Sequence, residues 1–112
     1  MFQLKYKEFT ALFTGDCNFQ EEQRIFKTGF SLKSDLLKVG HHAGAGSTSA
    51  KFLDSVSPKL AIACMPEWLS NDPKGKRVRE MLQQRNITFI RSWEFPDAVV
   101  FSNGKTFGIK IR

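Results

Sequence analysis

The two histidines of this 112-residue chain are adjacent, at His41 and His42, and a run of small, glycine-rich residues follows them. An imidazole can move a proton, donate a hydrogen bond to an anion or bind a metal ion near neutral pH. Successive residues at a strand end point in different directions, so at most one of the pair would bind a given metal. The alternative is an ordinary polar loop, which is the more common setting for two such histidines.

Two aspartates stand where a carboxylate could bind a cation. Asp16 lies just past the predicted strand 9–14, after Gly15, and open α/β sheets bind ligands just beyond their strand ends. Asp72 precedes Pro73, which is also a standard helix start, and Asp16 could likewise cap the helix after it. Asp16 with one imidazole supplies two ligands, whereas a zinc site needs three or four, so these residues cannot form a full site alone.

A basic cluster follows Asp72. Four positive charges fall within six residues there, on Lys74, Lys76, Arg77 and Arg79. With a net charge of +6 and a pI near 9.6, the chain favours anionic partners such as phosphates and nucleic acid. The alternative is a solvated helix face. Trp68 and Trp93 could stack on a base or sugar, although packing explains both at least as well.

The elements that must position these residues alternate between strands and helices. Asn18 and Glu21 form a capping-box pattern, Ser49 or Thr48 can cap a second helix, and Asp72 a third. The predicted strands are residues 2–6, 9–14, 36–39, 60–64, 88–90, 98–101 and 107–111, and the predicted helices cover about 19–27, 50–57 and 73–85. This order predicts an α/β domain over residues 1–112, with a mixed sheet and helices on one face. The apolar residues on the other face then require a partner.

Several classes of protein are excluded by composition. No stretch approaches the roughly 18 uncharged apolar residues of a membrane helix, and the N-terminus lacks the pattern of a signal peptide. Taken as complete, the chain is expected to be cytoplasmic. Cys17 and Cys64 have no Cys-x-x-Cys spacing, and we expect both to be reduced core thiols.

Two motifs, taken together, carry a resemblance to a known family. Thr14-Gly15-Asp16 and Lys38-Val39-Gly40-His41-His42, with Ser47-Thr48-Ser49 after them, resemble the second half of the metallo-β-lactamase superfamily. The branch most similar contains the C-terminal domain of the late-competence DNA-uptake protein and the choline-phosphate esterases. The resemblance implies the C-terminal half of an αββα sandwich. It also implies that Asp16 bridges two zinc or manganese ions, with His41 first and His42 second as the imidazole that contacts the scissile phosphate.

The sequence departs from that family in two places. The His-x-His-x-Asp-His motif, which supplies most of the metal ligands, does not occur in these 112 residues. Asn71-Asp72-Pro73 stands where the family has a late histidine, so Asp72 is a candidate oxygen ligand. We therefore expect a partial domain whose exposed sheet face is covered by a missing N-terminal half or by a second copy in a homodimer.

Three functions are consistent with these patterns. The first is a fragment or degenerate form of a metal-dependent phosphodiester hydrolase that is inactive as an isolated chain. The second is a non-catalytic nucleic-acid-binding or assembly module that uses the basic cluster. The third is one subunit of a split hydrolase. Binding to phosphates would weaken steeply with salt, which distinguishes the second function cheaply.

Overall fold

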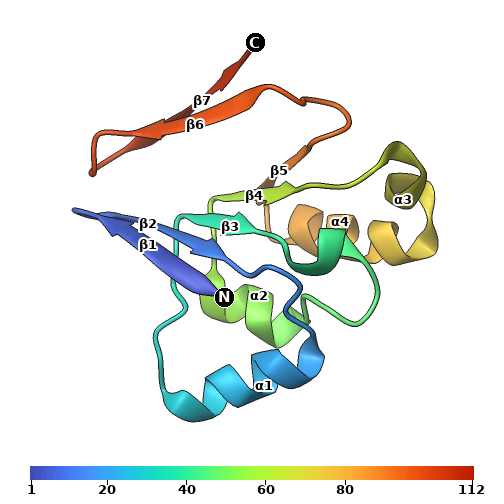
Figure 1. The fold of residues 1–112 in the computed structure, drawn as a ribbon, viewed down its shortest axis with the longest axis horizontal. Coiled ribbons are helices and arrows are strands. Elements are labelled where there is room, and N and C mark those ends of the chain that lie inside the picture. The colour runs from blue at the N-terminus through green and yellow to red at the C-terminus, as the bar shows by residue number, and fades with distance from the viewer.

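The computed structural model describes residues 1–112 and contains two β-sheets with helices on one side (Figure 1). The strands are β1 (Phe2–Tyr6), β2 (Phe9–Phe13), β3 (Leu36–Lys38), β4 (Leu60–Ala63), β5 (Thr88–Arg91), β6 (Ala98–Ser102) and β7 (Phe107–Ile111). The helices are α1 (Phe19–Thr28), the 3₁₀ turn η1 (Gly40–Ala43), α2 (Ala50–Val56), α3 (Glu67–Asn71) and α4 (Pro73–Gln84). The α/β class is confirmed. No helix is long and apolar enough to cross a bilayer.

The larger sheet has the strand order β1-β2-β3-β4-β5, with β1 antiparallel to β2 and the other pairs parallel. Each parallel connection runs through helix: α1 joins β2 to β3, η1 and α2 join β3 to β4, and α3 and α4 join β4 to β5. The carboxyl ends of β2 to β5 therefore lie at one edge of the sheet. The segments that follow these strands include Asp16, the two histidines and the residues preceding α3.

The predicted helix boundaries are confirmed by their caps. Asn18 and Glu21 form the capping box that begins α1, and Gly29 ends this helix in the left-handed conformation. The Ser49 hydroxyl accepts from the amide of Phe52 at the start of α2. Asp72 accepts from the amide of Lys74 at 2.9 Å, with Pro73 in the first turn of α4. These local signals act within a few residues, which is why the sequence predicts them well.

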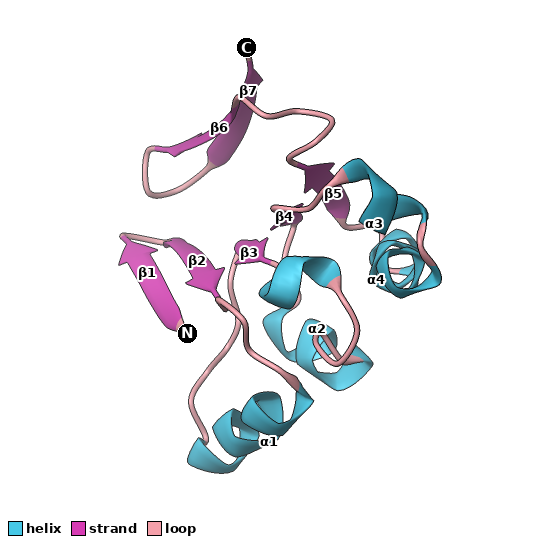
Figure 2. Cartoon of the chain, turned by 45° about the vertical axis from the view of Figure 1, so that its right-hand side comes forward, coloured by secondary structure: helices cyan, strands magenta, loops and turns pink.

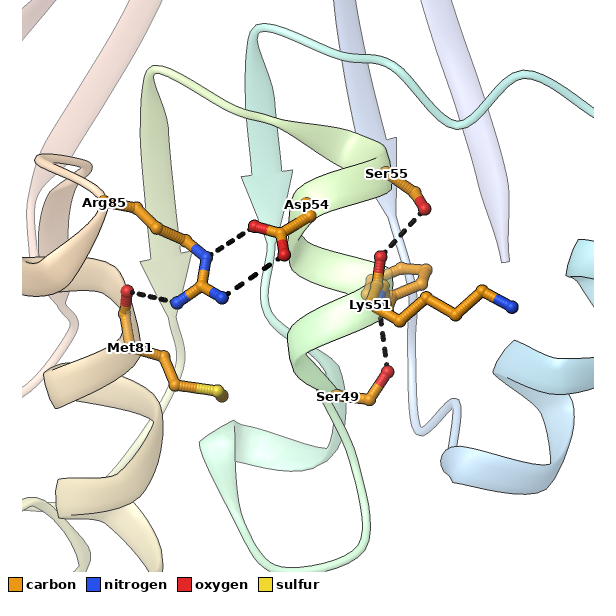
Figure 3. Close-up of polar contacts among 7 residues, drawn as sticks. Ser49, Lys51, Asp54, Ser55, Met81 and Arg85 are labelled. Carbon is orange, nitrogen blue, oxygen red and sulfur yellow. Dashed lines mark hydrogen bonds and ion pairs between the residues drawn. The ribbon is translucent and has the colours of Figure 1, made fainter.

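The main core lies between the helices and the larger sheet. Leu12, Leu37 and Ala61 of the sheet pack with Phe52 of α2 and Val78 of α4, all of them buried. Burial of one such large apolar side chain contributes roughly 1.5–3 kcal/mol. The guanidinium of Arg85 also ties α4 to α2, because its Nε donates to Oδ1 of Asp54 at 2.6 Å (Figure 3).

A second, two-stranded sheet covers part of the opposite face, which corrects the prediction of a single mixed sheet. Strands β6 and β7 form a separate hairpin above the larger sheet, away from the helices (Figures 1 and 2). The ring of Phe107 lies 5.7 Å from that of Phe9, in a second core that includes Leu36, Leu60 and Ile90. A pattern of alternating residues predicts a strand but not the sheet that it joins. β1 remains outside this cover, with Phe2, Leu4 and Tyr6 exposed.

One element was missed by sequence reasoning, and one prediction about a cysteine is corrected. The short helix α3 was not predicted, because five residues show too little periodicity to recognise. Cys17 is a buried free thiol as expected, but Cys64 is exposed and is not a core residue. It lies one position beyond the last residue of β4, where the chain leaves the sheet.

Candidate functional site

The loops that follow β2 and β3 are joined at the carboxyl edge of the sheet. The amide of His41 donates to the carbonyl oxygen of Gly15 at 3.0 Å, and the Thr14 hydroxyl donates to the Lys38 carbonyl at 2.6 Å. A side chain at Gly40 would place its Cβ 3.1 Å from both the Cys17 carbonyl oxygen and the Thr14 hydroxyl. Glycine at position 40 therefore allows the two loops to approach each other.

The histidines lie in a strained turn. His41, His42 and Ala43 have φ angles of 48°, 55° and 60°, in the left-handed region that side chains other than glycine disfavour. The cost is roughly 1–2 kcal/mol for each residue. Such a conformation persists only where the surroundings fix it, and it occurs preferentially at functional sites. The sequence showed only that a glycine-rich run follows the histidines, and the structure has a defined turn at the pair itself.

A buried carboxylate fixes the segment that follows this turn. Glu22 of α1 is 1% exposed, and its oxygens accept from the amides of Thr48 at 2.7 Å and Ser49 at 3.0 Å. Arg77 of α4 donates to the carbonyls of Ser47 and Thr48 on the same segment. Burial lowers the pKa of the Arg77 guanidinium, and Glu22 acts in the opposite direction. We call Glu22, Arg77 and residues 47–49 the loop clamp.

Glu22 was missed by sequence reasoning, although the sequence holds a signal for it. It lies three residues after Phe19, three before Ile25 and four before Phe26, so it occupies the apolar stripe of α1. A lone carboxylate in such a stripe must find a buried partner, because an unpaired buried charge is costly.

The two imidazoles have different surroundings. Nδ1 of His42 lies 2.6 Å from the carbonyl oxygen of Cys64. A carbonyl can only accept, so this nitrogen carries the proton, and Nε2 is left to bind a ligand or exchange a proton. His41 has no such side-chain bond, and its ring lies beside Gly44 at 6.5 Å from the ring of His42. The family resemblance favours His41 as the imidazole that contacts the phosphate, whereas the hydrogen bond to Cys64 orients the ring of His42.

A cleft of about 340 Å³ brings together several of the predicted site residues. Its lining includes His41, His42, Asp72 and Lys74, together with Trp68 of the unpredicted helix α3. These side chains come from η1 and from the junction of α3 and α4, and α2 and β4 separate the two segments in the sequence. The cleft is therefore a product of the fold and not of one local motif.

Asp16 does not share this cleft. Its exposed side chain lines a neighbouring hollow of about 420 Å³, together with Glu21 and Arg24 of α1. No three His, Cys, Asp or Glu side chains come together in a group that could hold a metal ion. A zinc site needs three or four protein ligands, so the residues of this chain do not fit a zinc or manganese centre by themselves.

The basic cluster divides in the structure. Lys74 lines the cleft and Lys76 is exposed, so both ammonium groups can meet an anion. Arg77 is turned inward as part of the loop clamp, and Arg79 donates to the Ser70 carbonyl at 3.5 Å. Sequence spacing alone cannot separate charges that face solvent from charges that hold backbone.

Comparison with known proteins finds bacterial relatives, each of which matches this chain over a small part of its own length. The chain is 43% identical over 102 residues to competence protein ComA of Neisseria gonorrhoeae, covering 90% of this chain and 14% of the relative. It is 32% identical over 81 residues to ComE operon protein 3 of Bacillus subtilis, covering 72% of this chain and 10% of the relative. A shorter match of 59 residues, 39% identical, is to recombination protein 2 of Haemophilus influenzae, covering 53% of this chain and 7% of the relative.

The relatives are much longer than this chain. It spans no more than 14% of the length of these curated relatives. No protein-family model matches it, so the metallo-β-lactamase assignment stays a prediction. The competence branch of the resemblance is supported, since one relative is named a competence protein and another a ComE operon protein. The chain is similar to a short segment of competence protein ComA and to a short segment of ComE operon protein 3.

Proposed function

We propose that this chain binds the phosphodiester backbone of DNA in the cleft formed by His41, His42, Asp72 and Lys74, and that this binding serves DNA uptake. The observation that carries the proposal is the meeting of two imidazoles and an ammonium group in one cleft at the carboxyl edge of the sheet. That edge is where open α/β sheets bind ligands. Competence is the capacity of bacteria to take up DNA, so the relatives favour DNA as the source of the phosphates.

The chemistry of the cleft residues suits a phosphodiester. Lys74 supplies a compact positive charge with three donors, and His42 has Nε2 free because Nδ1 is held by Cys64. The Asp72 carboxylate accepts from the amide of Lys74, which fixes the first turn of α4 beside the cleft. The net charge of +6 raises the local concentration of polyanions around the whole molecule.

The test is a DNA-binding titration followed by fluorescence anisotropy over a range of salt concentrations. Lys74→Ala removes one phosphate contact, so affinity should fall several-fold and the slope of log K against log salt should decrease by roughly one. Lys110→Ala, an exposed lysine of β7, makes the same charge change away from the cleft. The proposal fails if wild type binds no DNA at low salt, or if the two variants weaken binding equally.

Hydrolysis of the bound phosphodiester is the finer form of this proposal. It is supported by the resemblance and by the strained turn that presents the histidines. A zinc or manganese centre would require ligands from outside these residues, from a second copy or from another segment, because the donors present do not fit one. Metal content after incubation with zinc or manganese tests this, with Asp16→Ala as the matched variant. Stoichiometric metal that the variant loses supports hydrolysis, whereas absence of bound metal limits the chain to binding.

A further inference from the structure

Trp68 lies on the wall of the cleft and is 69% exposed, the largest exposure among the large apolar residues of the chain. Its neighbours on α3 face inward: Leu69 and Ser70 are buried, and the Ser70 hydroxyl accepts from Arg91 at 2.9 Å. The helix is thus anchored by the residues after Trp68. The indole remains open to solvent beside the histidines and Lys74.

Packing within the chain does not account for this tryptophan. The ring of Trp93 carries the guanidinium of Arg91 at 5.4 Å and is 37% exposed. Trp68 has no such partner among the aromatic and cation–π contacts of the chain. The two tryptophans therefore differ: one is held by its own chain and the other faces a cleft.

We propose that Trp68 stacks on an unpaired nucleobase, so that the cleft selects single-stranded over double-stranded DNA. This inference rests on the proposed function, because it adds a base contact to the phosphate contacts of Lys74 and the histidines. In a duplex each internal base is covered on both faces by its neighbours, whereas an unpaired base has a free face for an aromatic ring. Stacking on aromatic side chains beside a positively charged groove is the usual way in which proteins bind single strands.

The geometry of α3 and α4 keeps Trp68 and Lys74 at fixed positions. Gly75 packs so closely on the Leu69 carbonyl that a Cβ at position 75 would lie 2.0 Å from its oxygen. At this point the backbones of the two helices therefore meet directly. A base stacked on Trp68 and a phosphate bound to Lys74 would then both contact the junction of α3 and α4, which holds the two side chains at a fixed separation.

The experiment uses the Trp93→Phe variant, in which Trp68 is the only tryptophan. Its fluorescence is titrated at low salt with an oligodeoxythymidylate, with a duplex of the same length and with an abasic strand that keeps the phosphates. We expect the single strand to quench the fluorescence and to bind more tightly than the other two. In the wild-type background, Trp68→Ala should weaken single-strand binding roughly 10-fold and change duplex binding little.

The variants separate the inference from the function on which it rests. Trp68→Phe should recover part of the affinity, and Trp68→Ala should leave the salt dependence unchanged, whereas Lys74→Ala should weaken both forms of DNA and reduce that dependence. If Trp68→Ala leaves the ratio of single-strand to duplex affinity unchanged, the stacking proposal is wrong and phosphate binding stands. If no protein binds any DNA at low salt, both proposals are wrong.

Discussion

Glu22 shows how one residue can fix a site that it does not line. Its carboxylate holds two amides of residues 48 and 49, and Arg77 holds carbonyls of the same segment. The strained turn of His41 to Ala43 comes shortly before that segment and is tied to the preceding loop through Gly15. The loop clamp therefore supports the conformation in which the histidines reach the cleft.

Glu22→Ala should destabilise the protein by about 3 kcal/mol, because it leaves two buried amides unpaired and Arg77 without its nearest opposite charge. Glu22→Gln keeps one acceptor and should cost less. Urea unfolding of both variants measures the difference. Equal stability of Glu22→Ala and wild type would show that water replaces the carboxylate freely.

Cys17 predicts a pH dependence of stability. Burial raises the pKa of its thiol from the ordinary value of 9.0 to about 11, and the carboxylates of Glu22 and Glu21 act in the same direction. Between these values the unfolded thiol loses its proton while the folded thiol keeps it, so stability should fall as the pH rises from 9.0 to about 11.

Urea midpoints across this pH range test the prediction, with a variant for each cysteine. Cys17→Ala should remove part of the alkaline decline, and Cys64→Ala should retain it, since Cys64 is exposed. Equal declines in the two variants would assign the effect to other groups. The exposed Cys64 should also react with a thiol reagent in the folded protein, whereas Cys17 should react only after unfolding.

The role of a residue could be predicted from the sequence where that role depends on residues close to it in the sequence. The capping roles of Asn18 and Asp72 follow from local spacing and are confirmed. The inward turn of Arg77 and the bond between His42 and Cys64 depend on chain segments that lie far apart in sequence. No local pattern contains that information.

At the scale of elements, the junction of α3 and α4 depends on Gly75. An exposed Gly→Ala change inside a helix normally stabilises a protein by about 1 kcal/mol. Here the added Cβ would lie 2.0 Å from the Leu69 carbonyl oxygen, so Gly75→Ala should instead destabilise by about 1–3 kcal/mol. Thermal unfolding gives the sign. A stabilised variant would mean that α3 moves without cost, and DNA binding would then show whether Trp68 moved with it.

The elements themselves were largely predictable, since seven strands and the three longer helices follow from periodicity and caps. The exceptions have physical reasons. α3 is a single turn or so, and η1 has a left-handed backbone that no propensity favours. Both exceptions line the cleft, where the backbone conformation that the site requires differs most from the one that the local sequence favours.

At the scale of the whole molecule, the hairpin of β6 and β7 replaces part of the partner that the sequence appeared to require. It covers Phe9, Leu36 and Leu60 and leaves the apolar side chains of β1 exposed. A homodimer or another segment over β1 stays a prediction. Hydropathy could show that a cover was needed, but not that the chain itself supplied part of it.

Phe107→Ala should loosen this hairpin, because the ring packs on Phe9 across the gap between the two sheets. We expect a loss of about 2 kcal/mol, below the value for a fully buried phenylalanine, since Phe107 is only half-buried. Amide hydrogen exchange should show faster exchange in β6 and β7 than in β2 to β5. A uniform increase over both sheets would mean that they unfold as one unit.

The loop clamp also limits how this sequence can change over time. Glu22 lies in the first helix and Arg77 in the last, yet both bind the segment 47–49: Glu22 accepts from the amides of Thr48 and Ser49, and Arg77 donates to the carbonyls of Ser47 and Thr48. Loss of Arg77 would leave Glu22 buried without its counter-charge, and loss of Glu22 would leave the partly buried Arg77 without one, so a lineage that replaces one should soon replace both. Drift at these two positions should therefore be correlated, while the exposed lysines vary independently of each other.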